Sequence, residues 1–125
     1  METPKQKTIL IIDDDPEFVA ALSAFLTGHG YRVFKAYDAT VGIKHARKEE
    51  IDLMTLDLGL PAGGGLFVLK NVRKLGKTAA LPIIISTANV SNGIEKEVLG
   101  MGASDFIAKP YDLEVLLEKI RVFLP

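Results

Sequence analysis

Short, uninterrupted hydrophobic runs alternate along this chain with longer segments in which apolar residues recur every three or four positions. A continuous run bounded by turn residues is typical of a strand that is covered on both faces. The wider spacing is typical of a helix with one buried face. The pattern occurs five times, and the predicted strands are residues 9–12, 31–36, 51–56, 81–85 and 105–108.

A helix is predicted after each strand, and polar residues mark most of the helix starts. Pro16 suits the first turn of the first helix, with an Asp before it as N-cap. Asp38 and Asp112 are the expected N-caps of the second and fifth helices, and Ser91 or Asn92 that of the fourth. The predicted helices cover residues 16–28, 39–49, 66–75, 92–99 and 113–124.

Strict alternation of strands and helices predicts one α/β domain with a five-stranded parallel sheet between two layers of helices. Right-handed crossovers limit the possible topologies, and a doubly wound, flavodoxin-like (βα)5 fold with strand order 2-1-3-4-5 is expected. A chain of 125 residues has the common size of a single domain. We therefore expect one domain over residues 1–125, with residues 1–7 as a flexible lead.

Composition and charge exclude several classes of function. The formal net charge is −1, which gives no overall basic field to attract nucleic acid. The chain has no cysteine, so disulfides and thiolate metal sites are excluded. Its longest aliphatic runs are far shorter than the roughly 20 residues of a membrane span, and no apolar signal segment opens the sequence. A soluble, cytoplasmic protein without direct contact to nucleic acid or membrane is the expectation.

Residues with reactive side chains stand at the ends of four predicted strands. They are Asp13 with Asp14, Asp57, Thr87 and Lys109. A doubly wound sheet brings the carboxyl ends of its strands to one edge, where these carboxylates would repel one another. Mg²⁺ prefers oxygen ligands and would balance their charge. Acids, a metal, a hydroxyl and a lysine are the groups that phosphoryl transfer needs, and a carboxylate can itself become an aspartyl phosphate.

Four motifs at these positions resemble those of a known family, the CheY-like receiver domains of two-component response regulators. The resemblance covers essentially the whole chain, and the motifs occur in the family's order and at its spacing. They are Ile12-Asp13-Asp14, Leu56-Asp57-Leu58-Gly59-Leu60-Pro61, Ser86-Thr87-Ala88 and Lys109-Pro110. The resemblance implies a phosphorylation-dependent signalling switch. It also implies that the Lys109–Pro110 peptide bond is cis.

The resemblance implies a role for each matching residue. Asp57 would accept a phosphoryl group from a histidine kinase or phosphotransfer protein, and Lys109 would pair with the phosphoryl oxygens. Asp14, Asp57 and the backbone carbonyl of Gly59 would bind Mg²⁺ directly, and Asp13 would do so through water.

The switch and its output also follow from the resemblance. Thr87 would move toward the phosphoryl group, and Phe106 would turn inward with it. The face formed by the fourth helix, fifth strand and fifth helix would relay the state to a downstream effector or to a second copy of the chain. Such a domain is not a turnover enzyme, since it catalyses only its own phosphorylation and dephosphorylation.

Two alternatives stay open. A pseudo-receiver would be an interaction module without phosphorylation. A Mg²⁺-dependent hydrolase would carry Asp-x-Asp-x-Thr after its first strand, and Asp13 and Asp15 fit this pattern whereas Glu17 does not. One departure from the family concerns residues 63–65, three glycines where an Asp usually precedes a single glycine, so this loop is expected to be more mobile. The chain is either a whole single-domain regulator or the receiver of a longer protein.

Overall fold

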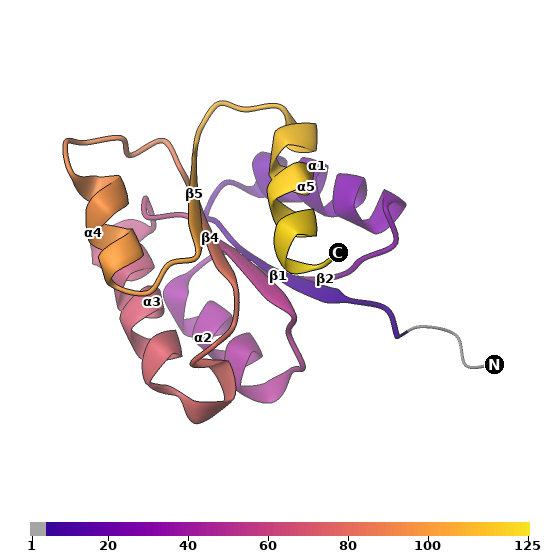
Figure 1. The fold of residues 1–125 in the computed structure, drawn as a ribbon, viewed down its shortest axis with the longest axis horizontal. Coiled ribbons are helices and arrows are strands. Elements are labelled where there is room, and N and C mark those ends of the chain that lie inside the picture. Colours follow the sequence, from indigo (N-terminus) through magenta and orange to yellow (C-terminus); the bar gives the residue numbers. More distant parts are fainter. Residues whose placement is uncertain (1–4) are drawn as a thin grey trace.

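A computed structural model describes residues 5–125, so residues 1–4 of the expected lead lie outside the described part. Strands and helices alternate along the chain (Figure 1). The strands are β1 Thr8–Ile12, β2 Arg32–Ala36, β3 Leu53–Leu56, β4 Ile83–Thr87 and β5 Asp105–Ala108. The α-helices are α1 Pro16–Gly28, α2 Ala39–Lys48, α3 Gly64–Lys74, α4 Ile94–Gly100 and α5 Leu113–Phe123. Short 3-10 helices cover Pro61–Gly63 and Gly76–Thr78.

All strand pairs are parallel, and the sheet has the order β2-β1-β3-β4-β5. Helices α1 and α5 lie on one side of the sheet, and α2, α3 and α4 lie on the other (Figure 1). This is the doubly wound arrangement with order 2-1-3-4-5 that the sequence predicts, and the prediction is confirmed. Within residues 5–125, no helix is both long and apolar enough to cross a membrane.

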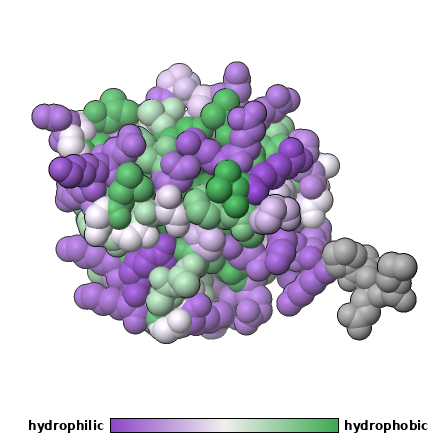
Figure 2. Space-filling model, viewed as in Figure 1, coloured by the Kyte–Doolittle hydropathy of each residue, from purple (hydrophilic) through white to green (hydrophobic). Residues whose placement is uncertain are grey.

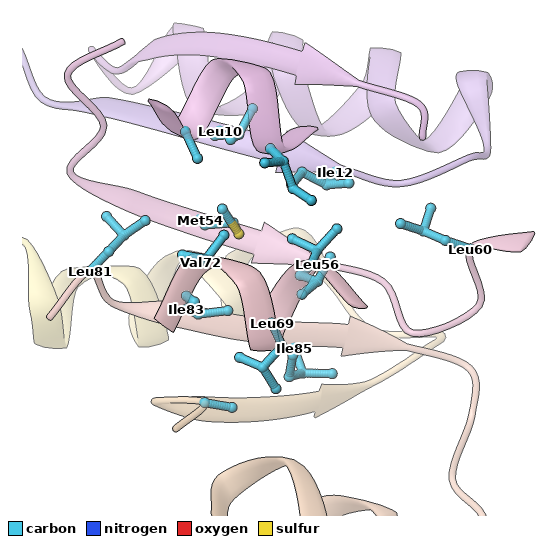
Figure 3. Close-up of a cluster of buried hydrophobic side chains, with 14 of the residues drawn as sticks. Leu10, Ile12, Met54, Leu56, Leu60, Leu69, Val72, Leu81, Ile83 and Ile85 are labelled. Carbon is cyan, nitrogen blue, oxygen red and sulfur yellow. The ribbon is translucent and has the colours of Figure 1, made fainter. Parts of the chain in front are cut away.

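Two hydrophobic cores hold the helices to the sheet. On one side, side chains of β1, β3 and β4 pack against α2, α3 and α4; Figure 3 shows Met54 and Ile83 beside Val72 of α3. On the other side, the alternate strand residues pack against α1 and α5, with Leu22 and Ile120 fully buried. The outer surface is mixed: Figure 2 shows mainly hydrophilic residues, with hydrophobic ones scattered among them. The sheet is therefore fixed from both sides.

The predicted helix caps have three different outcomes. The Asp15 side chain caps α1 by accepting hydrogen bonds from the N–H groups of Glu17 and Phe18. The Asp38 side chain caps α2 by accepting one from the N–H of Val41. Asp112 stands at the start of α5, but its side chain makes no capping hydrogen bond. The prediction for α4 is wrong: neither Ser91 nor Asn92 is its N-cap. That position is Gly93, whose φ of +82° is a conformation that glycine adopts without steric cost.

The glycine-rich segment is also organised differently from the prediction. Helix α3 begins at Gly64 and not at Leu66, so two of the three glycines belong to its first turn. Gly65 is needed for close packing, because a Cβ there would lie 2.6 Å from the Asp57 carbonyl oxygen and 2.6 Å from the Leu58 Cα. The Lys109–Pro110 bond is cis, as the resemblance implies.

Candidate active site at the carboxyl edge of the sheet

The sheet places the predicted acids side by side at its carboxyl edge. The backbone N–H of Asp13 donates to Ala36 and that of Asp57 donates to Ile12, so each acid is held directly beyond the end of a strand. The N–H of Lys109 donates to the Thr87 carbonyl in the same manner. Residues far apart in the sequence therefore meet because parallel strands end at one edge.

Lys109 joins two of the carboxylates. Its Nζ donates to Asp13 Oδ2 at 2.6 Å and to Asp57 Oδ2 at 3.2 Å. The side chains of Asp13 and Asp57 are only 3 % and 11 % exposed. Such charge-assisted bonds are short and strong when both groups are shielded from water. The acids and the lysine thus form a connected, largely buried charge cluster.

The remaining carboxylate oxygens of the buried acids also have partners. Asp13 Oδ1 accepts a hydrogen bond from the N–H of Asp15, and Asp57 Oδ1 accepts one from the N–H of Gly59. Asp14 differs from both, because it is exposed to solvent. Carboxylate oxygens of Asp13, Asp14 and Asp57 lie within 4.8 Å of one another, and this set of oxygen donors suits a hard cation such as Mg²⁺.

Burial and charge shift two pKa values in this cluster. Burial raises the pKa of Asp13, although the hydrogen bonds from Lys109 and Asp15 act in the opposite direction. For Lys109, burial would lower the pKa, but the hydrogen bonds and negative charges of Asp13 and Asp57 outweigh it, and the pKa is raised. The lysine is therefore held as a cation beside Asp13, whose burial disfavours the ionised form.

Thr87 and Phe106 lie apart from this cluster. Thr87 is fully buried, and its Oγ1 accepts a hydrogen bond from the N–H of Asn89 at 3.1 Å. Phe106 is half-buried on β5, packs against the aliphatic core and lines a groove beside α4. Among the described residues, no hydrogen bond joins Thr87 to Asp57.

Three side chains beside the cluster were not predicted to take part in it. The Phe18 ring lies against Lys109, with 4.1 Å between Nζ and the ring centroid. Tyr111 packs edge-to-face on Phe18, and its hydroxyl is 2.6 Å from Ser86 Oγ. The spacing of Phe18 from Leu22 and Leu26 is typical of the buried face of a helix and does not indicate a place at the site. Only its place in the first turn, immediately after the acids, could have indicated a position at the site.

Comparison with known proteins agrees with this geometry. A family model described as the response regulator receiver domain matches residues 9–121. Protein PilH of Pseudomonas aeruginosa is 34 % identical over 93 % of this chain and 96 % of its own length. Response regulator GtcR of Aneurinibacillus migulanus is 38 % identical over 85 % of this chain but only 43 % of its own length. The chain spans about half the length of several other curated response regulators that it matches.

A solved structure adds the metal to this comparison. The receiver domain of the sensor histidine kinase PA1611 from Pseudomonas aeruginosa is 27 % identical, with a TM-score of 0.86 over 96 % of this chain and 98 % of that one. It is described with a magnesium ion coordinated in its active site cleft. From its sequence, its fold and its acidic edge, this chain belongs to the response regulator receiver domain family, the regulatory modules of two-component signalling.

Proposed function

We propose that Asp57 accepts a phosphoryl group from the phosphohistidine of a histidine kinase or a phosphotransfer protein. A carboxylate oxygen of Asp57 attacks the phosphorus, the new O–P bond forms, and the P–N bond breaks with its electron pair returning to the imidazole. The observation that carries this proposal is the lysine contact: Lys109 Nζ is 3.2 Å from Asp57 Oδ2. A cation at that place is positioned to neutralise charge on the transferred group.

The proposed metal site consists of Asp14, Asp57 and the Gly59 carbonyl, with Asp13 acting through water. The exposure of Asp14 supports a direct role, since its oxygens are accessible to a cation. The Asp13 side chain is more deeply buried than that of Asp57 and has the shorter contact with Lys109, which supports a role through water. Bound Mg²⁺ would supply positive charge that offsets the charge of the phosphoryl oxygens.

The switch is proposed to involve Thr87 and Phe106. The Thr87 hydroxyl, whose oxygen accepts from the Asn89 N–H, would move and donate to a phosphoryl oxygen, one of the strong acceptors that phosphorylation adds at this edge. Phe106, which lines a groove beside α4, would then turn inward as Thr87 moves. The α4-β5-α5 face would present this change to an effector or to a second copy of the chain, as a shift between two populated states.

In this proposal the chain is one regulatory domain that works in the cytoplasm and is not a turnover enzyme. The hydrolase alternative would need Asp15 as a participating acid, but the Asp15 side chain caps α1. The pseudo-receiver alternative would leave the Asp57–Lys109 contact without a chemical role. Neither alternative is favoured by an observation of its own.

The test is an intact-mass measurement after incubation with Mg²⁺ and acetyl phosphate, with Asp57→Asn treated in parallel. The proposal expects a gain of one phosphoryl group in the wild type and none in the variant. Omission of Mg²⁺ should abolish the gain in the wild type. Lack of any gain, in a sample shown to bind Mg²⁺ and also unresponsive to phosphorylated histidine kinase, would favour the pseudo-receiver.

A further inference from the structure

The ammonium group of Lys109 touches three side chains, two from the loops after β1 and β3 and one from α1. Two are the carboxylates of Asp13 and Asp57, at 2.6 and 3.2 Å. The third is the ring of Phe18, whose centroid is 4.1 Å from Nζ. A cation over the face of an aromatic ring is attracted by the negative charge of that face, and this distance is well inside the range of the interaction.

Phe18 is held in place through both its backbone and its ring. Its backbone N–H donates to the Asp15 carboxylate that caps α1, at 3.3 Å. Its ring meets Tyr111 edge-to-face, with 6.2 Å between centroids and an interplanar angle of 87°. Tyr111 is held by the hydrogen bond of 2.6 Å between its hydroxyl and the buried Ser86. The ring face of Phe18 that contacts Lys109 is thus held in place by Tyr111 and, through it, by Ser86.

Metal binding and phosphoryl transfer together would change two of the three contacts of Lys109 and would leave the third chemically unaltered. Asp57 would become an acyl phosphate, and Asp13 would share its charge with the metal site. The Phe18 ring carries no charge and takes no part in the chemistry. A lysine side chain has many rotamers, so a contact that persists through the reaction limits where its ammonium group can lie.

We infer that Phe18 is a positioning residue that keeps the Lys109 ammonium group over Asp57 before and after phosphoryl transfer, with Tyr111 bracing its ring. This inference rests on the proposed function of Asp57. Its consequence is that the rate of phosphoryl transfer depends on the electron density of the ring at position 18. A ring that acted only as packing would have no such dependence.

The first experiment measures the rate of phosphorylation by acetyl phosphate at saturating Mg²⁺. Phe18→Leu keeps an apolar side chain but removes the ring face, and we expect the rate to fall about tenfold through misplacement of Lys109. Phe25→Leu is the matched control: Phe25 is a half-buried aromatic residue about two turns further along α1, where it packs on His29. Its rate should stay at the wild-type value.

The second experiment separates charge attraction from packing. Site-specific replacement of Phe18 by mono- and trifluorinated phenylalanine keeps the ring but withdraws electrons from its face. We expect the rate to fall stepwise with fluorination, while Mg²⁺ affinity and the urea midpoint stay unchanged. The inference is overturned if the fluorinated chains react at the wild-type rate, or if Phe18→Leu matches Phe25→Leu.

A third measurement does not depend on phosphorylation. The Lys109 ε-methylene protons should show an upfield ring-current shift in the NMR spectrum, and Phe18→Leu should remove it. If the shift is present but the wild type takes up no phosphoryl group, the proposed function fails and the contact stands. If the shift is absent, the positioning role fails whatever the chemistry of Asp57.

Discussion

Two neighbouring strands each end in a carboxylate, but the connections that follow them are built by opposite means. After β1, the Asp13 carboxylate accepts from the Asp15 N–H, and the Asp15 side chain caps α1. After β3, no side chain caps α3, and its N-cap is Gly63 with a φ of +72°. In both connections the first carboxylate accepts from the N–H two residues later, so the difference lies at the helix start: a polar side chain in the first connection and glycine backbone in the second.

This difference assigns different roles to the residues of the two connections. In the first, the Asp13 and Asp15 side chains have specific hydrogen-bond partners, so replacing one should remove a countable bond. In the second, the absence of a side chain at Gly65 lets the first turn of α3 approach the Asp57 carbonyl. Both connections hold a carboxylate in place. Substitutions should show that the start of α1 depends on side-chain hydrogen bonds and that the start of α3 depends on the absence of a Cβ at Gly65.

The largest effect is expected for Gly65→Ala. Its new Cβ would lie 2.6 Å from backbone atoms of both Asp57 and Leu58, neither of which can rotate away. We expect the free energy of unfolding to fall by about 1–3 kcal/mol, as for other overpacked sites. Phosphoryl uptake should fall as well, because Asp57 must shift. Urea denaturation and intact mass measure the two effects.

Gly28→Ala provides the control for this substitution. Gly28 is the last residue of α1, and a Cβ there meets nothing within 4 Å. Its stability should stay the same or rise by up to about 1 kcal/mol, since alanine restricts the unfolded chain. Equal losses in both variants would show that close packing at Gly65 is not the reason for its glycine.

Asp13→Asn tests the bonded connection and is expected to stabilise the chain in EDTA. Burial raises the pKa of Asp13, so the folded chain holds this proton more tightly than the unfolded chain. Between the ordinary pKa and the raised one, stability therefore falls as the pH rises. Asn removes that penalty, and Lys109 keeps Asp57 as its partner. We therefore expect a higher urea midpoint for Asp13→Asn than for the wild type at pH 7.

The pH dependence provides the check on this prediction. Urea midpoints of the wild type and Asp13→Asn, measured in EDTA, should approach one another as the pH falls below the ordinary pKa of an aspartate. With Mg²⁺ added, the wild type should gain more stability than the variant, because binding to the folded state stabilises it. A lower midpoint for Asp13→Asn at pH 7 in EDTA would show that the Asp13–Lys109 pair outweighs the cost of burial.

The outcome of the sequence predictions follows the same division. Strand order and the approach of Asp13, Asp57 and Lys109 depend on hydrophobic pattern and topology, which the sequence displays directly. The Asp15 cap was also predictable, since its side chain bonds within its own loop. The starts of α3 and α4 were not, because glycines at these positions have no side chain to indicate a cap. The contact of Phe18 with Lys109 depends on three-dimensional packing between distant segments.

A smaller effect is expected for Asp15→Ala, which removes the cap of α1. The Asp15 side chain accepts from two backbone N–H groups of the first turn, and loss of an N-cap costs about 1 kcal/mol. Asp112→Ala is the control, since Asp112 stands at the same position of α5 without a side-chain capping bond. Its effect on the urea midpoint should be much smaller. If both variants lost equal stability, charge at the helix start would matter more than the hydrogen bonds.

The smallest effect is expected for Ala62→Gly in the uncapped connection. Ala62 has a φ of +56°, a left-handed conformation that costs an L-residue roughly 1–2 kcal/mol. Glycine removes this conformational cost, but it also loses more conformational entropy on folding, which offsets part of the increase in the free energy of unfolding. We therefore expect a net stabilisation of only about 0.5 kcal/mol, visible as a higher urea midpoint with an unchanged slope.

The adjacent residue supplies the reverse substitution. Gly63 has a φ of +72° and open space around its missing Cβ, so Gly63→Ala changes conformational energy without a clash. It should lower stability by about 1 kcal/mol, opposite in sign to Ala62→Gly. If instead both variants lowered stability, local flexibility would dominate over left-handed strain in this connection. Opposite signs would show that backbone conformation alone sets the entry to α3, in contrast to the side-chain cap that sets the entry to α1.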